Sequence, residues 1–210
     1  MENTMLITVT KRVLNPNIID DAIKFMNLQI QKDELKKRIQ KFDEDTKLQF
    51  NAFLDRFELT NHLEKFSRYA QNNKFKINGE EINGIDADIS SLRIYLLLTC
   101  IDICVGKKYQ AGRNFKDAIK SISVKLREEL KGNLSVNNAS TITRIADCFW
   151  KLRCGYTHSG FRFHHIKNVK IRQVQLATDD AELELAPGFD LIAALKKTVS
   201  EIAQQRFGLV

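Results

Sequence analysis

The chain has 210 residues, of which 43% are apolar and 28% charged, with 33 basic and 26 acidic side chains. This length and apolar content fit one large domain, or two small ones that share a core, and exclude a disordered chain. The longest apolar run, residues 94–105, contains Asp102 and is shorter than the ~20 residues that cross a bilayer. The first ten residues lack the basic start and the cleavage site of a signal peptide. We therefore expect a soluble cytoplasmic protein with no membrane partner.

The positive charge is concentrated in the middle of the chain. Residues 1–102 carry a net charge of −1, residues 103–173 carry +11 and residues 174–210 carry −3. A segment this basic can attract a polyanion, usually RNA or DNA. The alternative is a solvated, lysine-rich helix face without a partner.

Helical periodicity dominates the first third of the chain. Pro16 favours a helix start, and residues 18–30 are predicted as the first helix. Asp33 can cap a long second helix that continues to Phe57, and Thr60 can cap a third through Tyr69. Residues 72–91 contain two Asn-Gly turn signals and are predicted as a loop with a small hairpin, where an N-terminal part would end.

The remaining chain is also predicted to be mainly helical. Residues 89–105 are apolar around most of a helix circumference, which indicates a buried central helix. Residues 113–131 are predicted as a single basic helix that Gly132 ends. Ser140 should cap a helix whose apolar stripe runs from Ile142 to Tyr156 and which ends near Ser159-Gly160. Residues 170–185 should form a β-hairpin, and Asp190 should cap the last helix.

Arg153 and His158 form the pair with the clearest chemical potential. They are five positions apart, which places them about 140° apart around a regular helix and ~7.5 Å apart along its axis. Both could hold one phosphodiester if the last helical turn distorts at Gly155 or if two copies of the helix meet across a dimer axis. Arg153 would then clamp the phosphate and His158 would transfer a proton. The alternative is an arginine and a histidine that cap helix carbonyls.

The pair resembles the R-x4-6-H signature of the HEPN superfamily of nucleotide-binding and ribonuclease domains. The neighbouring string from Trp150 to Gly155, followed by His158-Ser159-Gly160, is similar to uncharacterised bacterial members. The likeness extends upstream to residues 91–102, which resemble the central helix of the family with its acidic residue, and to residues 115–119, which resemble its next helix. It covers residues 86–206 and does not include residues 1–75.

The resemblance implies a mainly α protein. It would have a HEPN-like helical bundle over residues 86–206, a helical N-terminal extension over residues 1–75 and a small β-hairpin near the C-terminus, together in one compact unit. It also implies a homodimer in which the two motifs face each other. Active members are endoribonucleases that need no metal or other cofactor. There the histidine assists attack by the RNA 2′-hydroxyl and the arginine stabilises the charged phosphorane.

Three further residues are expected to support Arg153 and His158. Asp102 is a lone acid in an apolar run, so it should be neutralised or paired, either as a structural salt bridge or to position Arg153. Tyr156 ends the apolar stripe of the motif helix. Cys154 follows the arginine where the family often has asparagine or another polar residue, and its thiol forms only weak hydrogen bonds.

Residues 160–167 interleave aromatic and basic side chains, which can stack on bases and contact the phosphates of a single strand. The alternative is a loop whose phenylalanines fill the core. Together with one lysine of the motif helix, the predicted RNA-binding residues are Lys151, Arg162, Phe163, His164 and Lys167.

A zinc site is a weaker alternative for the same part of the chain. Cys154 and His158 share a helix face, and His164, His165 or Cys148 could complete the ligand set. No second pair of ligands has a standard spacing, so no metal is predicted. Cys100 and Cys104 are predicted as small core residues of a buried helix.

The sequence thus predicts an endoribonuclease that leaves 2′,3′-cyclic phosphate ends. Such an enzyme would be a toxin or a phage-defence effector, inhibited by an antitoxin or another defence-system protein. The alternative is a non-catalytic HEPN dimerisation or nucleic-acid-binding module.

Overall fold

The structure is a computed structural model. It describes residues 32–72, 75–77, 80–82, 85–106, 110–159, 176–178 and 181–209, together with Asp20, Ile23 and Met26. In these ranges the protein is mainly α, with seven helices and two small antiparallel sheets. The elements in chain order are α2 (Lys32–Gln40), α3 (Glu44–Asn72), β1 (Phe75–Ile77), β2 (Glu80–Ile82), α4 (Ile85–Val105), α5 (Ala111–Lys120), α6 (Val124–Asn133), β3 (Leu134–Val136), α7 (Ile142–Ser159), β4 (Leu176–Thr178), β5 (Ala181–Leu185) and α8 (Leu191–Arg206).

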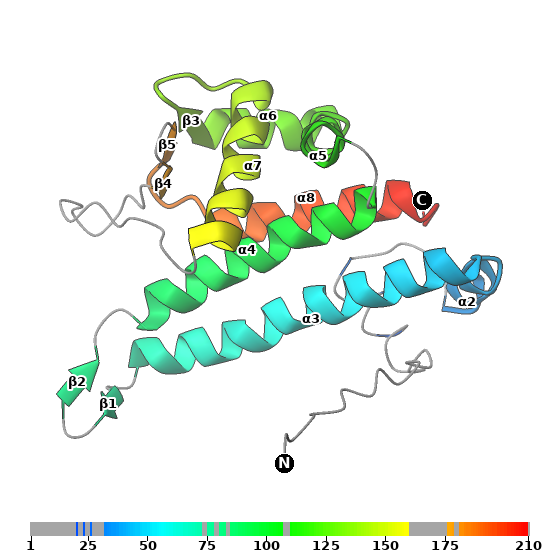
Figure 1. The fold of residues 1–210 in the computed structure, drawn as a ribbon, viewed down its shortest axis with the longest axis horizontal. Helices are drawn as coiled ribbons and strands as arrows, with labels where there is room; N and C mark the ends of the chain where they lie inside the picture. The colour runs from blue at the N-terminus through cyan, green and yellow to red at the C-terminus, as the bar shows by residue number, and fades with distance from the viewer. Residues whose placement is uncertain are drawn as a thin grey trace, which may run out of the picture.

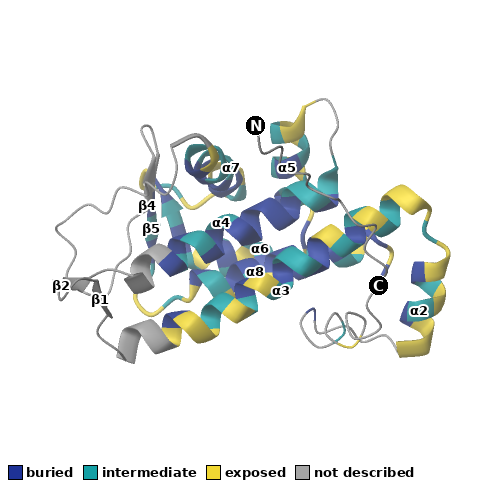
Figure 2. Ribbon diagram, turned by 60° about the horizontal axis from the view of Figure 1, so that its bottom comes forward, coloured by how far each residue is buried: buried dark blue, intermediate teal, exposed yellow. Residues whose placement is uncertain are grey.

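Helix α4 lies at the centre of the molecule. It packs along α3 on one side and against α8 on another, and α5 and α7 contact it as well (Figure 1). Its apolar residues surround the helix, and Leu97, Leu98 and Ile101 are fully buried. Figure 2 shows the buried residues of α4 between the surrounding helices. The prediction of a buried central helix is therefore confirmed, with a start at Ile85.

Aromatic rings hold α3 against the C-terminal end of the chain. The α3 residues Phe50 and Phe53 lie against Phe207, which follows α8, with ring centroids 4.9 and 6.0 Å apart. Phe50, Phe53 and Phe57 are at most 1% exposed. The N-terminal helix α3 and the C-terminal residues thus share one core, and the division into an N-terminal extension and a separate HEPN-like domain stays a prediction.

A three-stranded sheet adjoins α7. Its strand order is β3-β5-β4, and both pairs are antiparallel, with Leu134 opposite Leu185 and Leu176 opposite Leu183. The predicted hairpin near the C-terminus is confirmed by β4 and β5. The third strand, β3, was not predicted. The hairpin predicted within residues 72–91 is present as β1 and β2.

Three predicted helix boundaries are wrong. Helix α2 ends at Gln40 and α3 begins at Glu44, where the sequence predicted one long helix from Asp33. Thr60 lies inside α3 and does not begin a helix. Its hydroxyl donates to the Phe57 carbonyl oxygen of the same helix at 2.6 Å. Thr141, and not Ser140, caps α7 by accepting from the Arg144 N–H at 3.3 Å.

The single basic helix predicted over residues 113–131 is also wrong, because α5 and α6 are separate. Ser123 caps α6, and both its N–H and its hydroxyl donate to the Glu201 carboxylate of α8, the hydroxyl at 2.9 Å. Ile122, between the two helices, is 1% exposed. The break between α5 and α6 thus depends on a distant acid and a buried side chain. The Asp190 cap predicted for α8 depends on local residues and is confirmed.

The predicted first helix, residues 18–30, lies mostly outside the described residues. None of the helices that the structure describes is long and apolar enough to cross a membrane.

Candidate functional site

Helix α7 carries the Arg153/His158 motif, and its buried face fixes the direction in which the motif points. Ile145, Phe149 and Leu152 are at most 1% exposed and Tyr156 is 6% exposed, so the predicted apolar stripe is confirmed. Arg153 follows Leu152 and lies at the edge of this stripe, half-buried between α7 and α4.

Arg153 forms an ion pair with Asp102 of α4. Its Nε donates to Asp102 Oδ2 at 2.5 Å, and the exposed fractions of the two side chains are 27% and 19%. The contact predicted between the lone acid and the motif arginine is therefore present. Asp102 contacts the guanidinium through Nε and not through Nη1 or Nη2, and the Cys154 side chain is a further hydrogen-bond partner of Arg153.

The pair shifts the ionisation of both partners. Burial raises the pKa of the Asp102 carboxyl, and the hydrogen bond and charge of Arg153 oppose that shift. Burial lowers the pKa of the Arg153 guanidinium, but the hydrogen bonds and charges of Asp102 and Cys154 together raise it above its ordinary value. Arg153 is therefore a permanent cation at a half-buried position.

Trp150 covers one side of the Arg153 guanidinium. The Arg153 Cζ lies 5.3 Å from the centroid of the Trp150 ring, within the range of a cation–π contact. Trp150 itself packs against α5, where its ring centroid lies 5.3 Å from that of Phe115. A Cβ on Gly112 would be only 2.9 Å from Trp150 Cε2, so the ring position depends on a glycine there.

The end of α7 packs on α4 through two tyrosines. The rings of Tyr156 and Tyr95 stack with centroids 4.3 Å apart and planes 17° apart. Thr157 Oγ1 bonds to the Arg153 carbonyl oxygen at 2.9 Å and to the Tyr95 hydroxyl at 3.4 Å. Tyr156 thus supports the motif by fixing α7 on α4.

The other predicted site residues are described only in part. The backbone of His158 belongs to the last turn of α7, and the structure does not describe its side chain. Cys154 and Lys151 are half-buried on α7. The remaining RNA-binding candidates, Arg162, Phe163, His164 and Lys167, lie outside the described residues, as does His165.

Arg56 of α3 is a basic residue that the sequence reasoning missed. Its Nη1 donates to Thr99 Oγ1 at 3.1 Å, and Thr99 precedes Asp102 by one turn of α4. Arg56 also lowers the pKa of the Asp102 carboxyl by its charge. No local signal could identify it, because it belongs to a segment of nearly balanced charge that resembles no known family.

The described residues include no group of three or more histidine, cysteine or acidic side chains placed to hold a metal ion. Cys100, Cys104 and Cys148 are free thiols in the core, as predicted for the first two. Burial raises the pKa of the Cys100 and Cys104 thiols, which makes them poor nucleophiles and ligands.

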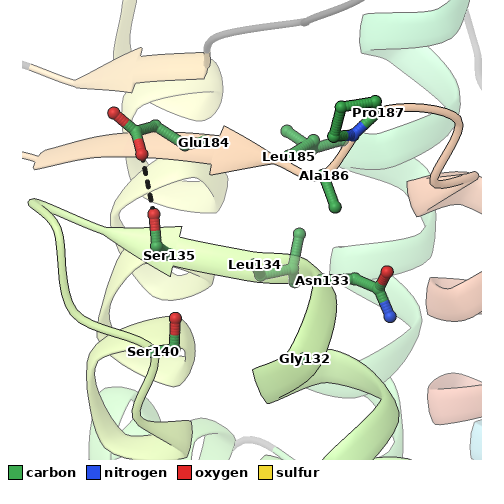
Figure 3. Close-up of a pocket in the computed structure, with 9 residues that line it drawn as sticks. All are labelled: Gly132, Asn133, Leu134, Ser135, Ser140, Glu184, Leu185, Ala186 and Pro187. Atoms are coloured by element: carbon green, nitrogen blue, oxygen red, sulfur yellow. Dashed lines mark hydrogen bonds between the residues drawn. The ribbon is translucent and has the colours of Figure 1, made fainter.

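A pocket of about 350 Å³ lies at the opposite end of α7, between β3 and the residues after β5 (Figure 3). Its one described carboxylate, Glu184, accepts a hydrogen bond from the Ser135 hydroxyl at 2.9 Å. Ser140 also lines it and precedes Arg153 by thirteen residues, or ~20 Å of helix. This pocket is therefore separate from the motif.

Comparisons with protein-family models, curated proteins and solved structures give no significant match to this chain.

Proposed function

We propose that the chain is a metal-independent endoribonuclease of the HEPN type, with a composite site of Arg153 and His158 in a homodimer. The observation that carries the proposal is the Arg153–Asp102 ion pair at the contact of α7 with α4. A half-buried arginine that is oriented by a carboxylate through Nε presents its two Nη groups in a fixed direction. This arrangement suits bidentate binding of a phosphate.

The chemistry divides between the two motif residues. Arg153 stays charged and stabilises the negative charge that develops on the phosphorane. His158, in the last turn of α7, transfers protons during attack of the RNA 2′-hydroxyl, which leaves a 2′,3′-cyclic phosphate and a 5′-hydroxyl. Because the two positions diverge by about 140° on one helix, Arg153 of one copy would act with His158 of the other.

A non-catalytic RNA-binding module is the second candidate. The observation in its favour is that neighbouring side chains already hold Arg153: Asp102 binds Nε, Trp150 covers the guanidinium, and Cys154 interacts with it as well. An arginine held in this way could bind a phosphate without taking part in a reaction.

RNA cleavage in EDTA separates the two candidates. We expect the purified protein to cut single-stranded RNA without metal, and His158→Ala and Arg153→Lys to lose about 10²–10⁴-fold of the rate. Arg144→Lys is the matched control, because Arg144 is an exposed arginine at the other end of α7. Wild-type cleavage by His158→Ala would assign the activity to another group and favour the binding module.

Light scattering tests the composite site directly. We expect a dimer at micromolar concentration for both the wild type and Arg153→Lys, since the interface does not depend on catalytic chemistry. A monomer that cleaves RNA under the same conditions would contradict the shared site.

A further inference from the structure

Arg56 is held at the contact of α3 with α4 by a neutral group. Its Nη1 donates to Thr99 Oγ1 at 3.1 Å, and the Thr99 hydroxyl in turn donates to the Leu96 carbonyl oxygen at 2.8 Å. Thr99 is 4% exposed, so this anchor is rigid. Within the described residues no carboxylate lies within 4 Å of the Arg56 guanidinium. Its charge is therefore not neutralised by direct contact.

Arg56 and Arg153 are both held by side chains on one ridge of α4. Thr99 anchors Arg56 and Asp102 anchors Arg153, and these two positions are three residues apart on the helix. Side chains with that spacing are neighbours on a helix face, with Cβ atoms roughly 5–6 Å apart. Arg56 from α3 and Arg153 from α7 thus both act by their charge on the carboxylate of Asp102.

Arg56 also lines an open groove of about 470 Å³ on α3, together with Asp55, Glu58, Leu59 and His62. Glu58 contacts His62 at 3.3 Å, and within the described residues no ion pair joins Arg56 to Asp55 or Glu58. On the α4 side, the charged groups that act on Asp102 are the two arginines, Arg153 and Arg56.

We propose that Arg56 binds an RNA backbone phosphate next to the one held by Arg153, so that α3, α4 and α7 form a two-arginine phosphodiester site. The inference rests on the proposed function, because it takes RNA as the ligand. A guanidinium with a neutral anchor keeps its full charge for an anion, and its remaining N–H groups can bind phosphate oxygens. Arg56 is a binding residue and takes no part in the reaction.

The salt dependence of RNA binding tests this assignment. Single-stranded RNA methylated at every 2′-oxygen cannot be cleaved by 2′-hydroxyl attack, so its affinity can be measured by fluorescence anisotropy in the active protein. Each phosphate contact to a single strand contributes a slope of about −0.7 to the plot of log K against log salt. We expect Arg56→Gln to reduce the slope by about 0.7 and the affinity by about 10-fold at low salt.

Arg68→Gln is the matched control. Arg68 lies on the same helix, its side chain is 75% exposed, and it pairs with Glu64 at 2.6 Å. It is twelve residues from Arg56, or ~18 Å along α3. Both variants change the net charge by one, but only Arg56→Gln should change the slope. An unchanged slope in Arg56→Gln, or an equal decrease in both variants, would overturn the proposal.

Thr99→Val provides a test that does not remove the arginine. Valine has a similar volume but cannot accept the Arg56 hydrogen bond, so the guanidinium keeps its charge and loses its anchor. We expect RNA affinity to fall about 2- to 10-fold while the melting temperature stays near the wild-type value. Wild-type affinity in a folded Thr99→Val protein would contradict a positioned Arg56.

The two proposals fail in different ways. RNA binding that depends on Arg56, without cleavage of unmodified RNA, would overturn the nuclease and leave the phosphate site in place. Cleavage with a KM unaffected by Arg56→Gln, together with an unchanged salt slope, would overturn the phosphate site alone.

Discussion

Asp102→Asn separates the effect of the Asp102 charge on folding from its effect on Arg153. The amide keeps the shape of the side chain and an oxygen that can accept from Nε, but it has no negative charge. Arg153 stays charged, so the amide oxygen still accepts a hydrogen bond from a cation, and the variant loses only the attraction between two opposite charges, about 1 kcal/mol or less for a partly exposed pair. Burial of the carboxylate opposes this loss, because it raises the pKa of Asp102 and makes the ionised form costly.

We therefore expect Asp102→Asn to change the free energy of unfolding at pH 7 by less than about 1 kcal/mol, or about 2–4 °C in melting temperature. Asp102→Ala should cost about 2 kcal/mol, because Arg153 then has no acceptor at a position where its side chain is only 27% exposed. RNA cleavage should fall strongly in both variants, since Arg153 loses its orientation. Full cleavage by Asp102→Asn would show that the carboxylate does not position Arg153.

The pH dependence of the stability difference gives the sharper test. Because the folded pKa of Asp102 lies above its ordinary value of 3.8, the folded protein binds this proton more tightly than the unfolded chain does. The contribution of Asp102 to stability is thus fully present below 3.8 and is lost as pH rises through the folded pKa. Urea unfolding of both proteins should be measured from pH 7.5 to 4. We expect the free energy of unfolding of the wild type to rise relative to that of Asp102→Asn as the pH falls. A fall in the relative stability of the wild type over the same pH range would show that burial is not the dominant influence on the pKa of Asp102.

Two further substitutions test the surroundings of the site. Gly112→Ala should lower the free energy of unfolding, measured in urea, by about 1–3 kcal/mol and reduce cleavage, because the new Cβ would lie 2.9 Å from Trp150 Cε2. Gly132→Ala is the control. A Cβ there meets nothing within 4 Å, so this variant should be neutral or stabilising. Glu64→Gln should cost about 1–3 kcal/mol at pH 7, since Lys196 and Arg93 hydrogen-bond to Glu64 and Arg93 is 7% exposed. Lys196 lowers the pKa of Glu64 below its ordinary value of 4.5. The stability that Glu64 contributes is therefore present above pH 4.5 and should be lost as pH falls through the folded pKa, which is the opposite pH dependence to that of Asp102.

The sequence predicted those elements whose signals are local. The apolar stripe of α7, the all-round apolar pattern of α4 and the Asp190 cap each depend on residues within a few turns. The pairing of Asp102 with Arg153 was also predictable, because a lone acid in an apolar helix needs a cation. These features are present in the structure because the packing of the chain agrees with the preferences of the local sequence.

The errors have long-range causes. Leu134 pairs with Leu185 across 51 positions to form β3, and a three-residue strand has no detectable alternation of its own. Glu201 binds Ser123 across 78 positions and favours the break between α5 and α6. In both cases the deciding partner is a side chain or strand that periodicity does not place. Thr60 is a local exception, because it matched a helix cap, yet its hydroxyl donates to the Phe57 carbonyl oxygen within α3.

The role of α3 at the site follows from the way it covers α4. Phe50, Phe53 and Phe57 bury one side of α3 in the shared core, and this contact fixes where Arg56 meets Thr99. Helix α7 meets the same ridge of α4 one turn later, where Asp102 holds Arg153. The guanidinium positions are therefore set by helix packing on α4 and not by a loop. Removing α3 would delete Arg56 and also expose the buried face of α4, so single substitutions separate the two effects where truncation cannot.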